Sequence, residues 1–129
     1  MVKVLLDSSA LIYCISGKTN FIVELENLLD KVDFCVTEST VRELILLSKI
    51  RRGSLASSAK KALEIVKKAK ILKSESENVD EDLLIVAKKS KAIVATSDKS
   101  LREKLIKSGV AVAFPTKGKR IRIDGFVEL

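Results

Sequence analysis

The chain alternates between two patterns of apolar and polar residues, and each pattern predicts a different kind of element. Short runs that are almost continuously apolar predict strands buried on both faces of a parallel sheet. These runs are Val2–Leu6, 32–36, 92–96 and 110–114. Between them, apolar residues recur every three or four positions, which is typical of amphipathic helices. The predicted helices begin at Ala10 or cover Phe21–Leu29, 38–50, 54–70, 79–89 and a last segment that ends at Lys107.

Small polar residues stand just before the periodic segments and are candidate helix caps. Their side chains can accept hydrogen bonds from the free N–H groups of the first helical turn. In chain order, the candidates are Ser8 or Ser9, Asn20, Thr37, Asn78, and Ser97 or Asp98. Gly109 is expected to end the last helix.

The order of these elements indicates the fold class. Strands that alternate with helices predict a three-layer α/β/α sandwich around a central, mainly parallel sheet. Residues 71–72 are expected to be extended, and residues 121–123 and 126–129 to add an edge strand or a tail. No linker, repeat or low-complexity block interrupts the sequence, so we expect a single domain over residues 1–129.

The composition limits where the chain works. It has 129 residues, of which 47% are hydrophobic, but no apolar run is long enough to cross a bilayer. The first residues are too short a run and too acidic at Asp7 for a signal peptide, so we expect a cytoplasmic protein without membrane contact. Cys14 and Cys35 lie in apolar runs and are expected to be reduced core thiols.

The absence of histidine and the basic charge narrow the chemistry. Without histidine, catalytic triads, histidine general bases and most zinc sites are excluded. Hydrolysis would have to depend on carboxylates, which together with water and carbonyl groups suit Mg²⁺, Mn²⁺ or Ca²⁺. The formal net charge of +7 favours nucleic acid as a partner, although such a charge also serves solubility alone. Aromatic residues make up only 4%, so stacking platforms for bases are scarce.

Four acidic residues stand at, or close to, the starts of predicted helices. Asp7 follows the first strand, Glu43 lies in the first two turns of a helix, Asp80 lies in a first turn, and Asp98 follows the third main strand. Because the carboxyl ends of parallel strands meet at one edge, these side chains can converge there. Carboxylates held together repel one another, and divalent metal relieves the repulsion. Two metals about 3.5–4 Å apart could then cleave a phosphodiester.

Each acid also has a purely structural explanation. Asp7 and Asp98 would serve as helix caps, and Glu43 would pair with a basic neighbour on a solvated face. Asp80, Glu81 and Asp82 all favour the helix dipole, and position alone does not choose among them.

Four segments carry a resemblance to a known family. They are VLLDSSALI (4–12), VTESTVRELILL (36–47), VDEDLLIVAKK (79–89) and AIVATSDKSLREKLIKSGV (92–110). Over nearly its whole length the chain resembles a PIN domain. PIN domains are similar to flap endonucleases in their site and cut single-stranded RNA using Mg²⁺ or Mn²⁺. Their pattern is an Asp after the first strand, a Glu within a later helix, an Asp at a helix start, and Thr/Ser-x-Asp after the next strand.

This resemblance implies roles for individual residues. Asp7, Glu43, Asp80 and Asp98 would be catalytic and would hold metal, in a site for two metal ions. Asp80 lies 18 residues before Asp98, and this separation matches the one between the third and fourth acids of the family. Asp82 lies too close to Asp98 and would be an outer acid at most. The family often has Asn where this chain has Ser9, and one branch has paired acids where this chain has Val79 and Asp80.

Residues beside the acids are candidates for contact with RNA. The predicted substrate-binding residues are Ser8, Thr96, Ser97, Lys99 and Arg102. Three more groups of basic residues would neutralise phosphates or, alternatively, form solvated faces. They are Lys49, Arg51 and Arg52; the lysines of 60–70; and Lys117, Lys119, Arg120 and Arg122.

The resemblance predicts a metal-dependent endoribonuclease and leaves its biological role open. The last motif and the basic tail resemble the branch that processes ribosomal RNA, with a ribosome-assembly partner. The VapC toxins share the same acids and pair with an antitoxin. A PIN module that binds RNA or protein without catalysis is a further alternative. A receiver-like domain fits the order of the acids poorly.

The resemblance also implies a homodimer. PIN domains commonly pair through helices beside the groove of the active site. The apolar residues of 41–50 form a stripe wider than one sheet face requires, and those of Phe21–Leu29 add to it. Alternatively, the next helix covers this stripe within one chain.

Overall fold

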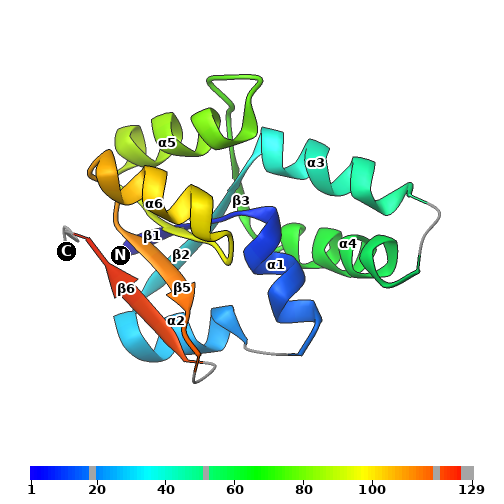
Figure 1. The fold of residues 1–129 in the computed structure, drawn as a ribbon, viewed down its shortest axis with the longest axis horizontal. Coiled ribbons are helices and arrows are strands. Elements are labelled where there is room, and N and C mark those ends of the chain that lie inside the picture. Colours follow the sequence, from blue (N-terminus) through cyan, green and yellow to red (C-terminus); the bar gives the residue numbers. More distant parts are fainter. Residues whose placement is uncertain (18–19, 51–52, 118–119, 126–129) are drawn as a thin grey trace.

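A computed structural model describes residues 1–17, 20–50, 53–117 and 120–125, and in them a sheet lies between two layers of helices (Figure 1). The predicted α/β/α sandwich is therefore confirmed. The strands are β1 (Val2–Leu6), β2 (Val32–Thr37), β3 (Lys70–Leu72), β4 (Ile93–Ala95), β5 (Val112–Pro115) and β6 (Ile121–Asp124). The helices are α1 (Ser8–Ile15), α2 (Phe21–Leu29), α3 (Glu38–Ser48), α4 (Gly53–Val66), α5 (Val79–Ser90) and α6 (Lys99–Lys107).

The strand order places the first strand at the centre of the sheet. The order is β3-β2-β1-β4-β5-β6, with β1 to β5 mutually parallel and β6 antiparallel to β5. The chain builds outward from β1 to β3 on one side and then returns to the other side of β1 with β4. Ligands of open α/β sheets bind beyond the carboxyl ends of the strands at such a reversal point. The fold thus indicates the junction of β1 and β4 as the place for a site.

Alternating residues of β1 divide the core into two halves. Val4 and Leu6 face the layer that contains α1, α2 and α4, where Leu11, Phe21 and Leu25 are fully buried. Leu5 faces the opposite layer, which α5 and α6 form with other apolar side chains. The nearly continuous apolar run of β1 follows from this burial on both faces.

Most of the predicted caps are confirmed, and one is wrong. Asn20, Thr37 and Asn78 cap α2, α3 and α5, and of the two candidates for α6 the cap is Asp98. The first helix, however, begins at Ser8 rather than at Ala10, and its cap is Asp7 instead of a serine. A carboxylate fulfils the same capping role as a hydroxyl.

Several element boundaries differ from the prediction. Helix α3 ends at Ser48, and α4 covers Gly53–Val66 rather than 54–70, because Lys68 and Ala69 close turns onto Ile65 and Val66. Strand β5 begins at Val112 rather than at 110, beyond a turn in which Gly109 has φ of 86°. A positive φ suits glycine, which lacks the Cβ that would clash. The predicted tail 126–129 and the basic residues Arg51, Arg52 and Lys119 lie outside the described residues.

Two smaller expectations concern the membrane and the thiols. In the described ranges, no helix combines the length and the apolar character that a membrane span requires. Cys14 and Cys35 are free thiols, as expected, and burial raises the pKa of both.

Candidate active site

The carboxylate of Asp7 lies at the junction of the two central strands. Its backbone N–H donates to Ala95 O of β4 at 3.1 Å, which fixes the end of β1 against its neighbour. Asp7 is only 4% exposed. Its Oδ1 accepts from Ala10 N at 2.8 Å as the cap of α1, and its Oδ2 accepts from Thr96 Oγ1 at 2.6 Å. The first predicted acid is thus held in place by groups from both strands.

The hydroxyl of Ser9 ties the same carboxylate to the loop after β4. It lies 2.8 and 2.9 Å from the two carboxylate oxygens of Asp7 and 3.1 Å from Thr96 Oγ1. It also accepts a hydrogen bond from Ser97 N at 3.0 Å. From the sequence, Ser9 was only a candidate cap and a departure from the family pattern. Its bridging role depends on a contact across 88 residues, which no local pattern reveals.

Burial makes the negative charge of Asp7 costly. Loss of solvent raises the pKa of Asp7 from 3.8 to about 6. Hydrogen bonds from Thr96, Ala10 and Ser9 lower this pKa, and the negative charge of Glu43 raises it again. A cation beside the carboxylate would relieve both the burial cost and the repulsion from Glu43.

Thr96, Ser97 and Asp98 form the loop between β4 and α6. Thr96 is fully buried, and its hydroxyl donates to Asp7 Oδ2, while its predicted contact with substrate stays a prediction. Its Oγ1 also accepts from Asp98 N at 3.0 Å, which sets the position of the next acid. Asp98 is exposed, and its Oδ1 caps α6 by accepting from Leu101 N at 3.2 Å. Its second carboxylate oxygen is not needed for the cap.

Glu43 reaches the same region from α3. The hydroxyl of Ser8, in the first turn of α1, donates to Glu43 Oε1. Ser8 was predicted to bind substrate, whereas in the structure it holds the second acid beside the first. The influence of Glu43 on the pKa of Asp7 reflects this proximity.

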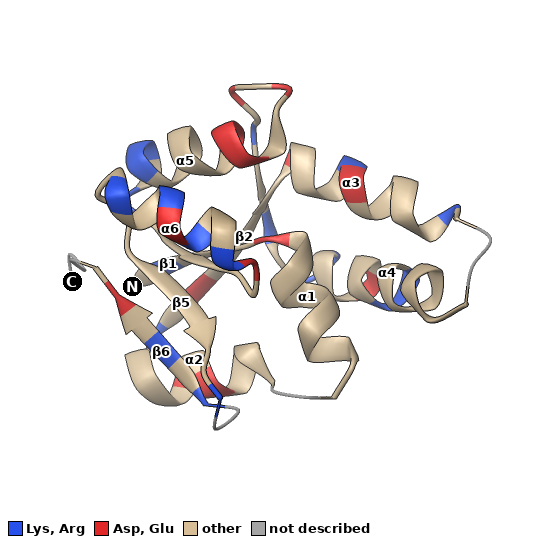
Figure 2. Cartoon of the chain, in the orientation of Figure 1, with Lys and Arg blue, Asp and Glu red and all other residues tan. Residues whose placement is uncertain are grey.

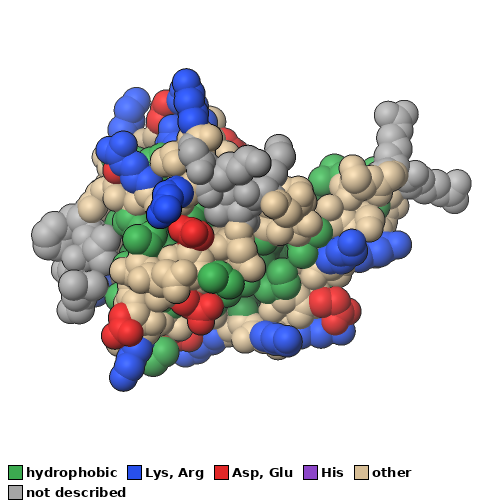
Figure 3. Space-filling model, turned by 90° about the horizontal axis from the view of Figure 1, so that it is seen from below, with side chains coloured by type: hydrophobic (Ala, Val, Ile, Leu, Met, Phe, Trp, Pro, Cys, Tyr) green, Lys and Arg blue, Asp and Glu red, His purple; other side chains and the backbone are tan. Residues whose placement is uncertain are grey.

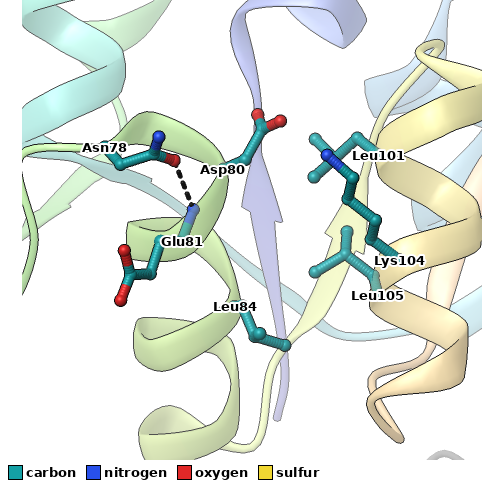
Figure 4. Close-up of a pocket in the computed structure, with 7 residues that line it drawn as sticks. All are labelled: Asn78, Asp80, Glu81, Leu84, Leu101, Lys104 and Leu105. Atoms are coloured by element: carbon teal, nitrogen blue, oxygen red, sulfur yellow. Dashed lines mark hydrogen bonds between the residues drawn. The ribbon is translucent and has the colours of Figure 1, made fainter.

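Asp80 stands on the opposite side of the site, in the first turn of α5. It is exposed and lines a cavity between α5 and α6, where its carboxylate is directed toward the side of Lys104 (Figure 4). Figure 2 shows acidic positions at the end of β1, in α3, and at the starts of α5 and α6, around the edge of the sheet where the parallel strands end. Among the described residues, however, no three of these side chains are close enough to form a ready-made metal site.

Asp82, two residues further, has a different place from Asp80. It is fully buried, and its Oδ2 accepts from Ser39 Oγ at 2.6 Å and from Ser74 Oγ at 2.8 Å. Its Oδ1 accepts from the backbone N–H groups of Glu75 at 2.6 Å and Ser76 at 3.1 Å. Burial alone would raise the pKa of Asp82, but these hydrogen bonds outweigh it and hold the pKa below its usual value.

The contacts of Asp82 give it a structural role. They join the first turn of α5 to the start of α3 and to the loop after β3, and so connect the helices that carry Asp80 and Glu43. The sequence left Asp82 as an outer acid. Its helical spacing from the buried Leu83, Val86 and Ala87 was a signal that it faces inward.

The predicted cationic contacts lie on α6. Lys99 is exposed in the first turn. The guanidinium carbon of Arg102 lies 4.1 Å from the centre of the Phe114 ring, a distance typical of a cation–π contact. This contact orients the guanidinium group of Arg102 over the ring but does not use the N–H donors of that group. The exposed Lys49, Lys60, Lys61, Lys67, Lys68, Lys70, Lys117, Arg120 and Arg122 are more remote in sequence from the acids.

Comparison with known proteins decides the family. A family model described as "PIN like domain" matches residues 4–115. The chain belongs to the PIN-like domain family. This confirms the resemblance carried by the four sequence segments.

PIN-family proteins similar to the chain include curated relatives and solved structures. It is 33% identical to Ribonuclease VapC4 of Methanocaldococcus jannaschii, over 98% of the chain and 100% of that protein. It is 31% identical to Ribonuclease VapC9 of Archaeoglobus fulgidus, over 95% of the chain and 87% of that protein. The structure of the PIN domain endonuclease Utp24 matches with a TM-score of 0.78 and 22% identity, over 98% of the chain and 94% of that structure. VapBC2 from Rickettsia felis, bound to a DNA fragment from its promoter, matches with a TM-score of 0.65 and 14% identity, over 89% of the chain and 100% of that structure.

Proposed function

We propose that this PIN-family chain is a metal-dependent endoribonuclease that cleaves single-stranded RNA. The observation that carries the proposal is the buried carboxylate of Asp7, fixed by Thr96 at the reversal point of the sheet and close to Glu43. The two relatives named as ribonucleases, each matched over most of its length, support the same activity.

Asp7, Glu43, Asp80 and Asp98 are the residues proposed to hold Mg²⁺ or Mn²⁺. Carboxylate oxygens are suitable ligands for both ions, and the chain has no histidine that would favour zinc. The costly charge on Asp7 fits a neighbouring cation. When bound, one or two such ions supply an activated water and stabilise the oxygen that leaves the phosphate.

The proposed activity is tested with a labelled single-stranded RNA. We expect cleavage with Mg²⁺ or Mn²⁺ and none after addition of a chelator, with recovery when excess metal is restored. Asp98→Asn, which keeps a cap for α6 but removes the charge, should lower the rate at least tenfold. Asp33→Asn, on β2 outside the candidate site, is the matched control and should cleave normally. Cleavage that persists in chelator, or equally in Asp98→Asn, would contradict the proposal.

For the biological role, we favour a VapC-type toxin that works in the cytoplasm and is held inactive by an antitoxin partner. The full-length matches to proteins named VapC support this role over ribosomal-RNA processing. The similarity to Utp24 supports the shared fold alone, because the identity is 22%. A non-catalytic module would not need the four carboxylates to be kept. Toxicity on expression, relieved by a protein encoded beside the gene, would separate the toxin from the other roles.

A homodimer is part of the proposal. Helix α3 leaves Leu46 68% exposed, Ile50 42% and Ile45 38%, while Leu44 is buried. Helix α4 therefore covers only part of the wide apolar stripe. Figure 3, a view from below Figure 1, shows further hydrophobic side chains exposed between charged groups on the side of the molecule where α2 and α4 lie. A second copy would bury the same apolar residues on both subunits.

We expect light scattering to give twice the chain mass of 14.2 kDa for the wild type and a single chain mass for Leu46→Arg. The added charge would have to be desolvated at the interface. Ile106→Arg, which changes a 37% exposed residue of α6, is the matched control and should remain a dimer. A wild type that is monomeric at micromolar concentration would rule out this interface.

A further inference from the structure

A cavity between α5 and α6 has Asp80 at its edge, but its other lining residues have no part in the proposed metal site. Its volume is about 270 Å³, and Figure 4 shows its lining side chains arriving from the two helices. Leu84 of α5 faces Leu101 and Leu105 of α6, which are 3% and 1% exposed. Pockets for drug-sized ligands measure roughly 300–1,000 Å³, so this one suits a single flat ring system. We call it the α5–α6 pocket.

The mouth of the α5–α6 pocket carries both signs of charge. Asp80 provides a carboxylate from α5, and Lys104 provides an ammonium group from α6. The carboxylate of Glu81 is turned away from the pocket and accepts a hydrogen bond from Ser76 Oγ at 3.4 Å. In the described structure, no ion pair joins Asp80 to Lys104, so the ammonium group of Lys104 is available to a ligand. Asp80 is also one of the four acids of the candidate active site. Whatever enters the pocket therefore lies beside the place where a phosphate would be cut.

The combination of walls and mouth selects the ligand. The carboxylate of Asp80 at the entrance would repel a phosphate that entered the pocket itself. A purely aliphatic side chain of a protein partner would fill the walls but leave the charges at the mouth unpaired. A nucleobase has flat apolar faces for the leucines and an edge with both hydrogen-bond donors and acceptors. Unpaired bases of single-stranded RNA can be splayed out and read in this way.

We propose that the α5–α6 pocket binds one unpaired base of the RNA, next to the phosphate that is cut. This inference rests on the proposed function and adds a residue-level basis for the choice of cleavage position. Leucine side chains take the place of the aromatic platforms that are scarce in this chain. Lys104 contacts the edge of the base, and Asp80, as a proposed metal ligand, remains beside the phosphate.

The test measures binding in the presence of chelator, so that it does not depend on hydrolysis. Two fluorescent oligonucleotides of equal length are compared, one ordinary single-stranded RNA and one with the same backbone but no bases. Leu84→Trp fills the half-buried side of the pocket. We expect it to weaken binding of the ordinary RNA about tenfold, in the range typical for loss of one stacked base, and to leave the abasic strand unaffected.

Ile106→Trp is the matched control, because it adds the same ring to an exposed part of α6 that does not line the pocket. It should bind both strands like the wild type. On the wild type itself, methyl NMR should show shifts of Leu84, Leu101 and Leu105 with ordinary RNA but not with the abasic strand.

Equal effects of Leu84→Trp on both strands, or unshifted leucine methyls in RNA-bound wild type, would overturn the base-binding inference. Because the NMR measurement uses the wild type, it decides the question even if Leu84→Trp does not fold. Failure of the metal-dependent cleavage assay is a separate result that would contradict the nuclease proposal instead.

Discussion

Replacement of Asp7 by Asn is expected to abolish RNA cleavage and, in the metal-free protein, to raise the melting temperature. Cleavage should fall at least 100-fold, more than the roughly 10- to 100-fold cost of losing an outer partner of a metal site. The gain in stability follows from burial. In the wild type, Asp7 is only 4% exposed, so its charged carboxylate is poorly solvated, whereas the amide of Asn is neutral.

The stabilisation by Asp7→Asn should depend on pH. Because the pKa of Asp7 is about 6 in the folded state and 3.8 is the ordinary value, the folded protein holds its proton more tightly. The stability linked to this proton is complete below pH 3.8 and is lost as the pH rises through about 6. The difference between these two pKa values corresponds to a free energy of about 3 kcal/mol. We expect about half of this as net gain, because the amide must donate where the carboxylate accepted from Thr96.

Thermal unfolding in chelator at pH 4 and at pH 7 checks this prediction. The variant should melt about 4–8 °C above the wild type at pH 7 and no higher than the wild type at pH 4, where only the penalty of the amide remains. Asp33→Asn, at the opposite end of the sheet, should show no such difference. A variant that is destabilised at pH 7, or stabilised equally at both pH values, would mean that burial does not govern Asp7.

Replacement of Asp82 by Ala should have the largest effect on stability. It removes the acceptor of two serine hydroxyls and two backbone N–H groups at once. Each unsatisfied buried group costs about 1–3 kcal/mol, and partial rehydration of the loop lowers the total, so we expect a loss of about 3–5 kcal/mol in the free energy of unfolding. Urea unfolding measures this loss.

Two neighbours provide controls for Asp82. Asp82→Asn should cost less, about 1–2 kcal/mol, because its oxygen can still accept from the backbone while its amide donates to a serine. Glu81→Gln is exposed and should stay within about 0.5 kcal/mol of the wild type. Asp80→Asn should show the reverse behaviour, with stability kept and cleavage lost. If Asp82→Ala unfolds like the wild type, the hydrogen bonds of Asp82 do not hold the start of α5.

The fold was largely predictable because the pattern of apolar and polar residues within each element indicates whether it is a helix or a strand. The apolar run of β1 and the helical spacing of α2 and α5 reflect burial that repeats along one element. The errors came where a contact outside the element decides the outcome. Asp7 caps α1 although Ser8 and Ser9 stand closer to the first apolar helical residue, since Asp7 is fixed between β1 and β4.

The four acids were proposed from the sequence and remain a proposal, whereas the hydroxyls that position Asp7 and Glu43 were not predicted in that role. The order of Asp7, Glu43, Asp80 and Asp98 follows from the ends of elements and from the family pattern. Thr96 and Ser8 were expected to touch RNA, but their hydroxyls are used on Asp7 and Glu43. Which partner a hydroxyl selects depends on residues far away in sequence, so composition and spacing do not reveal it.

The hydrogen bond between Thr96 and Asp7 joins residues 89 positions apart, and this separation matters while the protein is being made. Chains emerge from the ribosome with the N-terminal part first, at about 5–20 residues per second. Until β4 has emerged, β1 lacks its neighbour on that side, and Asp7 has neither the hydroxyl of Thr96 nor the loop that carries Asp98. An unfinished chain therefore has no assembled site, and a ribosome making this protein is not exposed to its activity before most of the chain has been synthesised.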